Sequence, residues 1–255
     1  MADEFRESPN GRAEAHGATP PPAEPVPVVR CLADVEARPV AWVWERWIPR
    51  GALTILDGDP GLGKSTLMMD LAARITRGWG MPPAGDGAGG EPAGVLLLTA
   101  EDALDVTVRP RLDAAGADPA RVHALEAVKT GDDERPPVLP WDLALVESLI
   151  AYKGVRLIVA DPIMAYLDGQ LDAHRDQDVR RLLHQLMLLA DRTGTAIVLV
   201  RHLNTLTGPP ALYRGGGSIG IIGAVRSALL VGRHPSEAHH YVLASNKCNL
   251  AARPR

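Results

Sequence analysis

The fold of this chain is decided by the stretch Gly51-Ala52-Leu53-Thr54-Ile55-Leu56-Asp57 and the loop after it, Gly58-Asp59-Pro60-Gly61-Leu62-Gly63-Lys64-Ser65. The first stretch is a short apolar run and predicts a buried strand. The second fits the pattern G-x-x-x-x-G-K-[ST], in which glycines permit the backbone turns that aim several N–H groups at a phosphate. Residues 65–77 carry apolar side chains at helical spacing, so a helix adds its positive N-terminal end. Strand, glycine loop and helix in this order predict a P-loop.

Further along the chain, short apolar runs alternate with helical patterns. Strands are expected at 95–98, 155–160 and 196–200 and around 226–231 and 241–244, and helices at 142–152 and 178–192. Such alternation is typical of a parallel sheet covered on both faces. The sequence therefore predicts an α/β fold with a mostly parallel twisted sheet flanked by helices on both faces. Ligands of such sheets bind beyond the carboxyl ends of the strands.

The P-loop pattern predicts binding of ATP and Mg²⁺. We expect Lys64 to contact the β- and γ-phosphates and the Ser65 hydroxyl to ligate Mg²⁺. Asp161 ends the strand expected at 155–160, where a carboxylate can hold Mg²⁺ directly or through water. An aspartate that caps a turn before Pro162 is the alternative interpretation. The expected nucleotide-binding residues are Gly58, Asp59, Pro60, Gly61, Leu62, Gly63, Lys64, Ser65, Thr66 and Asp161.

Two further polar residues follow strand ends and are candidates for catalysis. Glu101, which is nearer its strand than Asp102, could orient and polarise the water that attacks the γ-phosphate. A solvated acidic loop or a helix cap would explain the same carboxylates. His202, together with Asn204, could donate hydrogen bonds to the γ-phosphate and report its loss. A surface histidine after a strand is the alternative.

Two stretches near the C-terminus suggest contacts with other molecules. Arg226 begins an apolar run, where an unpaired charge would be costly, so we expect it to meet an anion such as the nucleotide of a neighbouring subunit. The stretch Tyr213-Arg214-Gly215-Gly216-Gly217-Ser218 combines an aromatic ring, a cation and backbone freedom. These features suit contact with a phosphate backbone or stacking on a base, and a solvated linker is equally compatible with them.

Composition limits the remaining possibilities. Residues 1–30 hold six prolines and few large apolar side chains, which predicts a disordered proline-rich tail before one domain at 31–255. The formal net charge of −4 argues against a wholly basic nucleic-acid coat. Cys31 and Cys248 show no paired or metal-ligand spacing. We expect no membrane span, because there is no run of 18 or more apolar residues. The N-terminus lacks a signal peptide's apolar core, so a cytoplasmic location is expected.

The ordered set of motifs resembles the RecA-type ATPases close to the RepA group of hexameric replicative helicases, from about Trp42 to the end of the chain. The matching pieces are Trp47-Ile48-Pro49-Arg50-Gly51, Gly58 to Thr66, Thr99 to Asp102, Leu157 to Pro162, Val200 to Asn204, Tyr213 to Gly220, Ala224 to Ser227 and Asn246 to Leu250. The chain has Thr205 where many relatives carry lysine, and it ends at Arg255, where relatives usually continue with further strands.

The resemblance implies a RecA-like core that assembles into a ring, with ATP bound between subunits. It implies that Glu101 is the catalytic base, Asp161 the Walker-B acid and His202 the γ-phosphate sensor. Arg226 would be an arginine finger inserted into the next subunit, with Lys247 close to the nucleotide. The loops after Asp161 and His202 would line a channel for single-stranded DNA.

Three classes of function follow. The leading expectation is an ATP-hydrolysing motor or recombination-type ATPase that acts on single-stranded DNA as a homo-oligomeric ring. The second is a RecA-like switch in which ATP controls assembly or docking without unwinding. The third, a P-loop kinase acting on a small molecule, needs a lid of basic residues, and the sequence has no arginine-rich segment of that kind.

Overall fold

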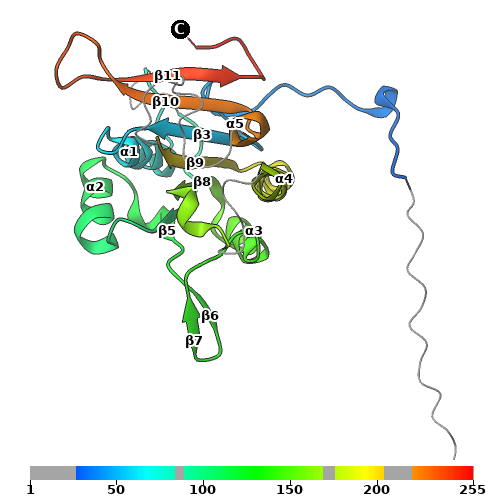
Figure 1. The fold of residues 1–255 in the computed structure, drawn as a ribbon, viewed down its shortest axis with the longest axis horizontal. Coiled ribbons are helices and arrows are strands. Elements are labelled where there is room, and N and C mark those ends of the chain that lie inside the picture. Colours follow the sequence, from blue (N-terminus) through cyan, green and yellow to red (C-terminus); the bar gives the residue numbers. More distant parts are fainter. Residues whose placement is uncertain (1–26, 84–88, 169–175, 204–219, 255) are drawn as a thin grey trace, which may run out of the picture. The chain divides into compact units, whose positions relative to one another are not determined.

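A seven-stranded sheet forms the centre of residues 39–255 in this computed structural model (Figure 1). Its strand order is β11 (Tyr241–Cys248), β10 (Ser227–Arg233), β3 (Leu53–Gly58), β9 (Ala196–His202), β8 (Val155–Asp161), β4 (Gly94–Thr99) and β5 (Val122–Ala124). Every neighbouring pair is parallel except β10 and β11. The prediction of a mostly parallel α/β sheet is therefore confirmed.

Helices cover both faces of this sheet, as the sequence predicts. One core cluster joins α1 (Lys64–Arg77) and α2 (Arg109–Ala114) to the sheet, and the other joins α3 (Leu143–Lys153), α4 (Asp176–Thr193) and α5 (Gly220–Ala224). Within β4, Val95 and Leu97 belong to the first cluster, whereas Leu96 and Leu98 belong to the second. Side chains alternate between the faces of a strand, so an apolar run such as this one contributes to both cores.

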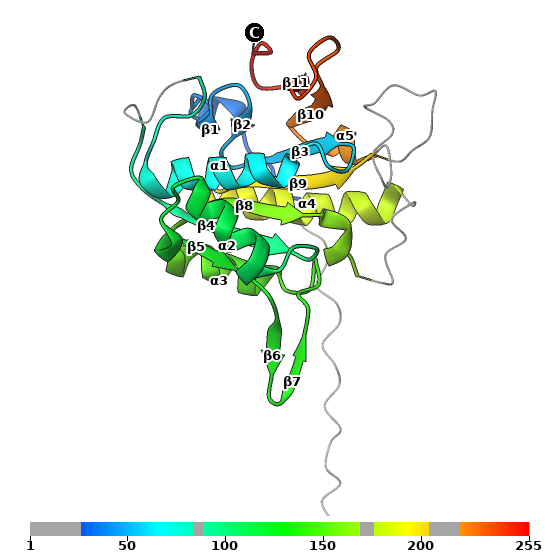
Figure 2. The same cartoon turned by 90° about the vertical axis from the view of Figure 1, so that its left-hand side faces the viewer.

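Two hairpins lie outside the predicted elements. The first joins β1 (Trp42–Trp44) and β2 (Ile48–Pro49), and the second joins β6 (Val128–Thr130) and β7 (Asp133–Arg135). The second hairpin projects away from the sheet in both views (Figures 1 and 2). An ion pair lies at its base, where the Arg135 guanidinium donates to both carboxylate oxygens of Asp142 at 2.7 and 2.8 Å.

Short helical segments complete the fold. They are η1 (Leu32–Asp34), η2 (Leu104–Val108), η3 (Pro119–Arg121) and η4 (Ile163–Tyr166). The structure describes residues 27–83, 89–168, 176–203 and 220–254, and the chain divides into the units Met1–Arg38 and Pro39–Arg255. Most of the predicted tail, Asn204, Thr205 and the stretch 213–218 lie outside the described residues. None of the helices in the described ranges is both long enough and apolar enough to cross a membrane.

Candidate functional site

The predicted site residues converge at one edge of the sheet, where the parallel strands end. Gly58 of β3 lies opposite His202 of β9, and Thr99 of β4 lies opposite Asp161 of β8. The backbone continues this alignment, because the N–H of Ala100 donates to the carbonyl of Asp161 at 3.3 Å. Parallel pairing thus brings together side chains that are far apart in the sequence.

The glycine loop joins β3 to α1 and wraps around the Lys64 side chain. Gly61 and Gly63 have φ angles of 76° and 80°, in the left-handed region that glycine enters without steric cost. Leu62, 6% exposed, packs into the core and fixes the loop. Lys64 is buried, and its ammonium donates to the carbonyls of Gly58 at 2.8 Å and Asp59 at 3.0 Å. Burial lowers the pKa of Lys64, against the opposing effect of Asp161 and other carboxylates nearby.

Ser65 and Asp161 form the candidate magnesium site. The Ser65 hydroxyl donates to Oδ2 of Asp161 at 2.7 Å, so an alcohol and a carboxylate oxygen lie next to the phosphate loop. Burial raises the pKa of Asp161, while the Ser65 hydrogen bond acts in the opposite direction. These are the hard oxygen ligands that Mg²⁺ takes alongside waters and phosphates. The residues present therefore fit the ion.

His202 links the P-loop lysine to Glu101. Its Nδ1 lies 3.2 Å from Nζ of Lys64, and its Nε2 lies 3.4 Å from Oε2 of Glu101. An ammonium can only donate, so Nδ1 accepts, and in the neutral ring Nε2 carries the proton that points at the carboxylate. The contacts form a chain from Lys64 through His202 to Glu101.

Asp102 contacts Arg111 instead of His202, although it is adjacent to Glu101 in the sequence. Its Oδ2 accepts a hydrogen bond of 2.7 Å from Nη1 of Arg111 in α2. Glu101 is 62% exposed in its side chain and lies beside His202, on the open side of the site. Glu101, rather than Asp102, therefore lies beside His202 and the P-loop lysine.

A buried ion pair next to this edge was missed by the sequence analysis. Nε and Nη2 of Arg201 donate to the two carboxylate oxygens of Asp57 at 2.9 Å each, and both side chains are 2% exposed. The two residues lie opposite each other on β3 and β9, one position before Gly58 and His202. The available signal was a charged residue at the end of each apolar strand, but their pairing depends on strand order, which the sequence did not reveal.

Arg226 and Lys247 lie at the opposite edge of the sheet from the P-loop. The N–H of Arg226 donates to the carbonyl of Leu53, at the start of β3. The predicted strand begins one residue later than expected, because Arg226 immediately precedes β10 and is exposed, so the anion expected beside this charge stays a prediction. The Lys247 ammonium donates to the carbonyls of Ile222 at 2.7 Å and Gly223 at 3.2 Å. Burial, aided by the charge of Arg226, lowers the pKa of Lys247.

Within one chain, then, the structure brings together five of the predicted residues: Lys64, Ser65, Glu101, Asp161 and His202. A glycine loop between a buried strand and a helix, with lysine, serine and a strand-end aspartate in contact, defines a P-loop nucleotide-binding protein. Residues 19–207 match the model of the family described as AAA domain. Because that match spans well over half of the chain, the chain belongs to this family.

Two relatives extend the comparison. The chain is 24% identical to the DNA repair protein RadA of Bacillus subtilis (strain 168) over 170 residues, which are 65% of this chain and 31% of RadA. It is 25% identical to the DNA repair protein RadA of Halalkalibacterium halodurans over 167 residues, 64% of this chain and 31% of that protein. The match thus spans about a third of each relative's length. Family and relatives together identify a RecA-type P-loop ATPase.

Proposed function

We propose that this protein hydrolyses ATP and couples hydrolysis to single-stranded DNA, as a ring in which neighbouring subunits complete each other's sites. The convergence of Lys64, His202 and Glu101 at one sheet edge carries the ATPase part of the proposal. The DNA part is supported by the two relatives, which are named as DNA repair proteins. Unwinding of duplex DNA, as in the RepA-like helicases, is the finer form of the same proposal.

The contacts around Lys64 suggest how these residues act on the nucleotide. Lys64 would exchange its contacts with the loop carbonyls and with His202 for phosphate oxygens. Nδ1 of His202 would then lose its donor, so the side chain could reorient toward the γ-phosphate and release Glu101. Glu101 would orient the attacking water and accept its proton.

Two residues that already contact each other, Ser65 and Asp161, are the proposed magnesium ligands. Ser65 and Asp161 would hold Mg²⁺, which neutralises charge on the β- and γ-phosphates when it is bound. The hydroxyl of Ser65 would give up its hydrogen bond to Asp161 and offer its lone pair to the ion. Asp161 would remain ionised beside the metal.

The test compares ATP hydrolysis by the wild-type chain with and without a single-stranded oligonucleotide, at low salt and saturating Mg²⁺. We expect the oligonucleotide to bind and to raise the rate. An unchanged rate together with no binding would refute the DNA part and favour the RecA-like switch, in which ATP controls assembly. A strand-displacement assay on the same samples tests the helicase form separately.

A matched pair of variants tests the catalytic assignment. Glu101→Gln keeps the side-chain shape and removes the base, so hydrolysis should fall about 10²–10⁴-fold while ATP binding persists. Asp102→Asn is the control, because this carboxylate is engaged by Arg111 instead of His202. Equal losses in the two variants, or none in Glu101→Gln, would show that Glu101 is not the base.

A further inference from the structure

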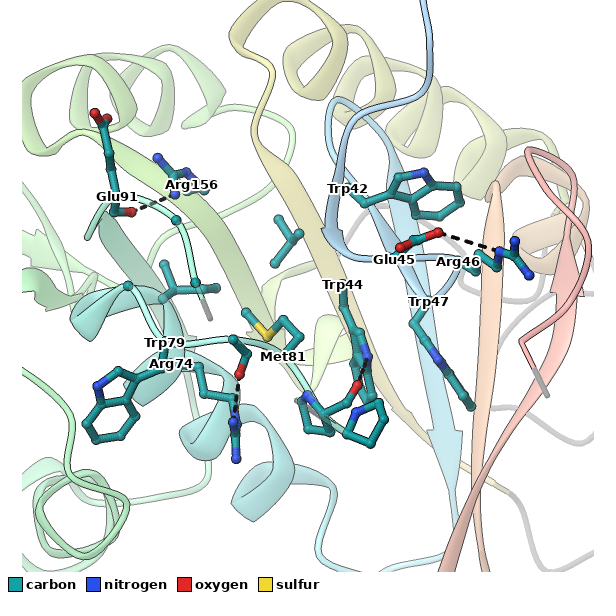
Figure 3. Close-up of a pocket in the computed structure, with 18 of the residues that line it drawn as sticks. Trp42, Trp44, Glu45, Arg46, Trp47, Arg74, Trp79, Met81, Glu91 and Arg156 are labelled. Atoms are coloured by element: carbon teal, nitrogen blue, oxygen red, sulfur yellow. Dashed lines mark hydrogen bonds and ion pairs between the residues drawn. The ribbon is translucent and has the colours of Figure 1, made fainter. Parts of the chain in front are cut away.

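A cavity of about 830 Å³ lies at the far end of α1 from the P-loop, between the β1–β2 hairpin and residues 78–83 and 89–91 (Figure 3). Four of the chain's five tryptophans line it, namely Trp42, Trp44, Trp47 and Trp79. Its volume is in the range of ligand-binding cavities, about 300–1,000 Å³. None of the nucleotide-site residues contributes to its lining, so the cavity is distinct from the nucleotide site.

The cavity already contains a contact between tryptophan and a proline carbonyl. Trp44 is buried and stacks on Trp47, with ring centroids 5.0 Å apart and an interplanar angle of 23°. Its indole Nε1 donates to the carbonyl of Pro82 at 2.8 Å (Figure 3). Pro83 and Pro254 also line the cavity. An indole donor bonded to a proline carbonyl is thus already part of the cavity wall.

The other three tryptophans that line the cavity are partly exposed, and their indole N–H groups are available to a ligand. The indole N–H groups of Trp42, Trp47 and Trp79 make no hydrogen bond to any residue in the described ranges. An indole N–H can donate and cannot accept. A ligand that fits should therefore present carbonyl acceptors together with apolar surface.

The charges of the cavity are nearly balanced. Three arginines line it, but Arg74 donates to Asp70 at 2.8 Å and to the carbonyl of Gly80 at 2.7 Å, and Arg156 donates to the carbonyl of Glu91 at 2.7 Å. The third, Arg46, lies 3.7 Å from the carboxylate of Glu45. A groove for a nucleic-acid backbone needs cations that are free to neutralise phosphates. This balance disfavours a polyanion such as a nucleic-acid backbone.

We propose that the cavity binds a proline-rich peptide segment in the polyproline II conformation. Such a segment has no internal hydrogen bonds, so its carbonyls are free, and its prolines have no N–H to satisfy. Its carbonyl groups can therefore accept hydrogen bonds from the indole N–H groups that line the cavity. Proline rings also pack against aromatic faces in the known grooves that recognise such segments.

The probe is a synthetic peptide with the sequence of residues 19–28, Thr-Pro-Pro-Pro-Ala-Glu-Pro-Val-Pro-Val. Its control has alanine at all five proline positions. The full chain is labelled with 5-fluorotryptophan, and the ¹⁹F resonances are assigned with single Trp→Phe variants. Trp141 serves as the internal reference, because its indole donates to Asp168 and it is outside the cavity lining. A second titration uses a chain with Pro20, Pro21, Pro22 and Pro25 replaced by alanine, so that these prolines cannot compete.

We expect the proline peptide to shift the Trp42, Trp47 and Trp79 resonances saturably and to leave Trp141 unmoved. It should bind at least about tenfold more tightly than the alanine peptide. Trp42→Phe and Trp79→Phe keep an aromatic face and remove one donor, so each should weaken binding about 2–10-fold. Trp141→Phe should leave binding unchanged. ATP turnover by each variant reports that it is folded.

Three outcomes would overturn the proposal. The first is equal binding of the proline and alanine peptides, and the second is no shift in either chain. The third is a shift of the cavity tryptophan resonances by a single-stranded oligonucleotide at moderate salt, with no shift by the peptide. The cavity would then be a nucleic-acid site.

Discussion

The buried pair between Asp57 and Arg201 gives a prediction whose size follows from the structure. Both side chains are 2% exposed, and two hydrogen bonds of 2.9 Å join them. Asp57→Leu would leave the Arg201 guanidinium inside the protein without its carboxylate. Breaking a buried pair in this way costs about 3–5 kcal/mol, whereas an exposed pair is worth about 0–1 kcal/mol. For a domain of this size, the larger cost corresponds to a fall in Tm of roughly 6–20 °C.

The assay is a double-mutant cycle in urea unfolding at fixed protein concentration, with Asp57→Leu, Arg201→Met and the double variant. Arg201 also interacts with other groups, so the coupling energy is the decisive quantity. The double variant should be less destabilised than the two single variants added together, because neither charge is then left alone. Asp113→Asn is the control, since it removes the exposed pair with Arg109 at 2.8 Å and should change stability by less than about 1 kcal/mol. Additive losses, or a cost for Asp57→Leu no larger than in the control, would refute the reasoning.

Three shorter predictions concern the nucleotide site, the opposite edge and the β6–β7 hairpin. Lys64→Ala should abolish ATP turnover, since the loop loses its only phosphate-directed cation; unchanged turnover would reject the site. Arg226→Ala should reduce hydrolysis about 10³–10⁵-fold and spare ATP binding measured with a fluorescent analogue, because a finger stabilises only transition-state charge. The hydrogen bond from Arg135 lowers the pKa of Asp142 below 3.8, so the stability from this pair is present above pH 3.8 and is lost as the pH falls further. Thermal melts between pH 3 and 7 should show that Asp142→Asn is less stable than wild type at pH 7, and that this difference shrinks toward pH 3.

The sheet and the P-loop could be predicted because their signals are local. The strand that precedes Gly58, the glycine pattern and the helical spacing after Lys64 each depend on a few consecutive residues. The expected strand at 155–160 extends by one residue in the structure, to Asp161, which therefore closes β8 beside the loop. Polar residues at strand ends then marked the site, because parallel strands finish at a common edge.

The contacts between distant elements could not be predicted in the same way. Whether β9 lies beside β3 decides if Arg201 meets Asp57 and if His202 meets Lys64, and strand order is a property of the whole sheet. The tryptophan-lined cavity could not be predicted from the sequence for a related reason. Trp42 and Trp79 are 37 positions apart, and only the packing of the β1–β2 hairpin near the end of α1 places them in one cavity.

The positions of Arg226 and Gly58 limit how the proposed catalytic set can be assembled. Arg226 lies beside Leu53, and Gly58 is five residues further along β3. At 3.3 Å per residue, the backbone at Leu53 lies about 16 Å from the backbone at Gly58. This is too far for the Arg226 side chain to reach the phosphate loop of its own chain. If Arg226 acts in catalysis, it therefore acts on a neighbouring subunit. Mixing Arg226→Ala with Lys64→Ala chains should then restore activity at interfaces where an intact P-loop meets an intact arginine. Mixed assemblies that form, as shown by native mass spectrometry, and yet stay inactive would contradict the placement in trans.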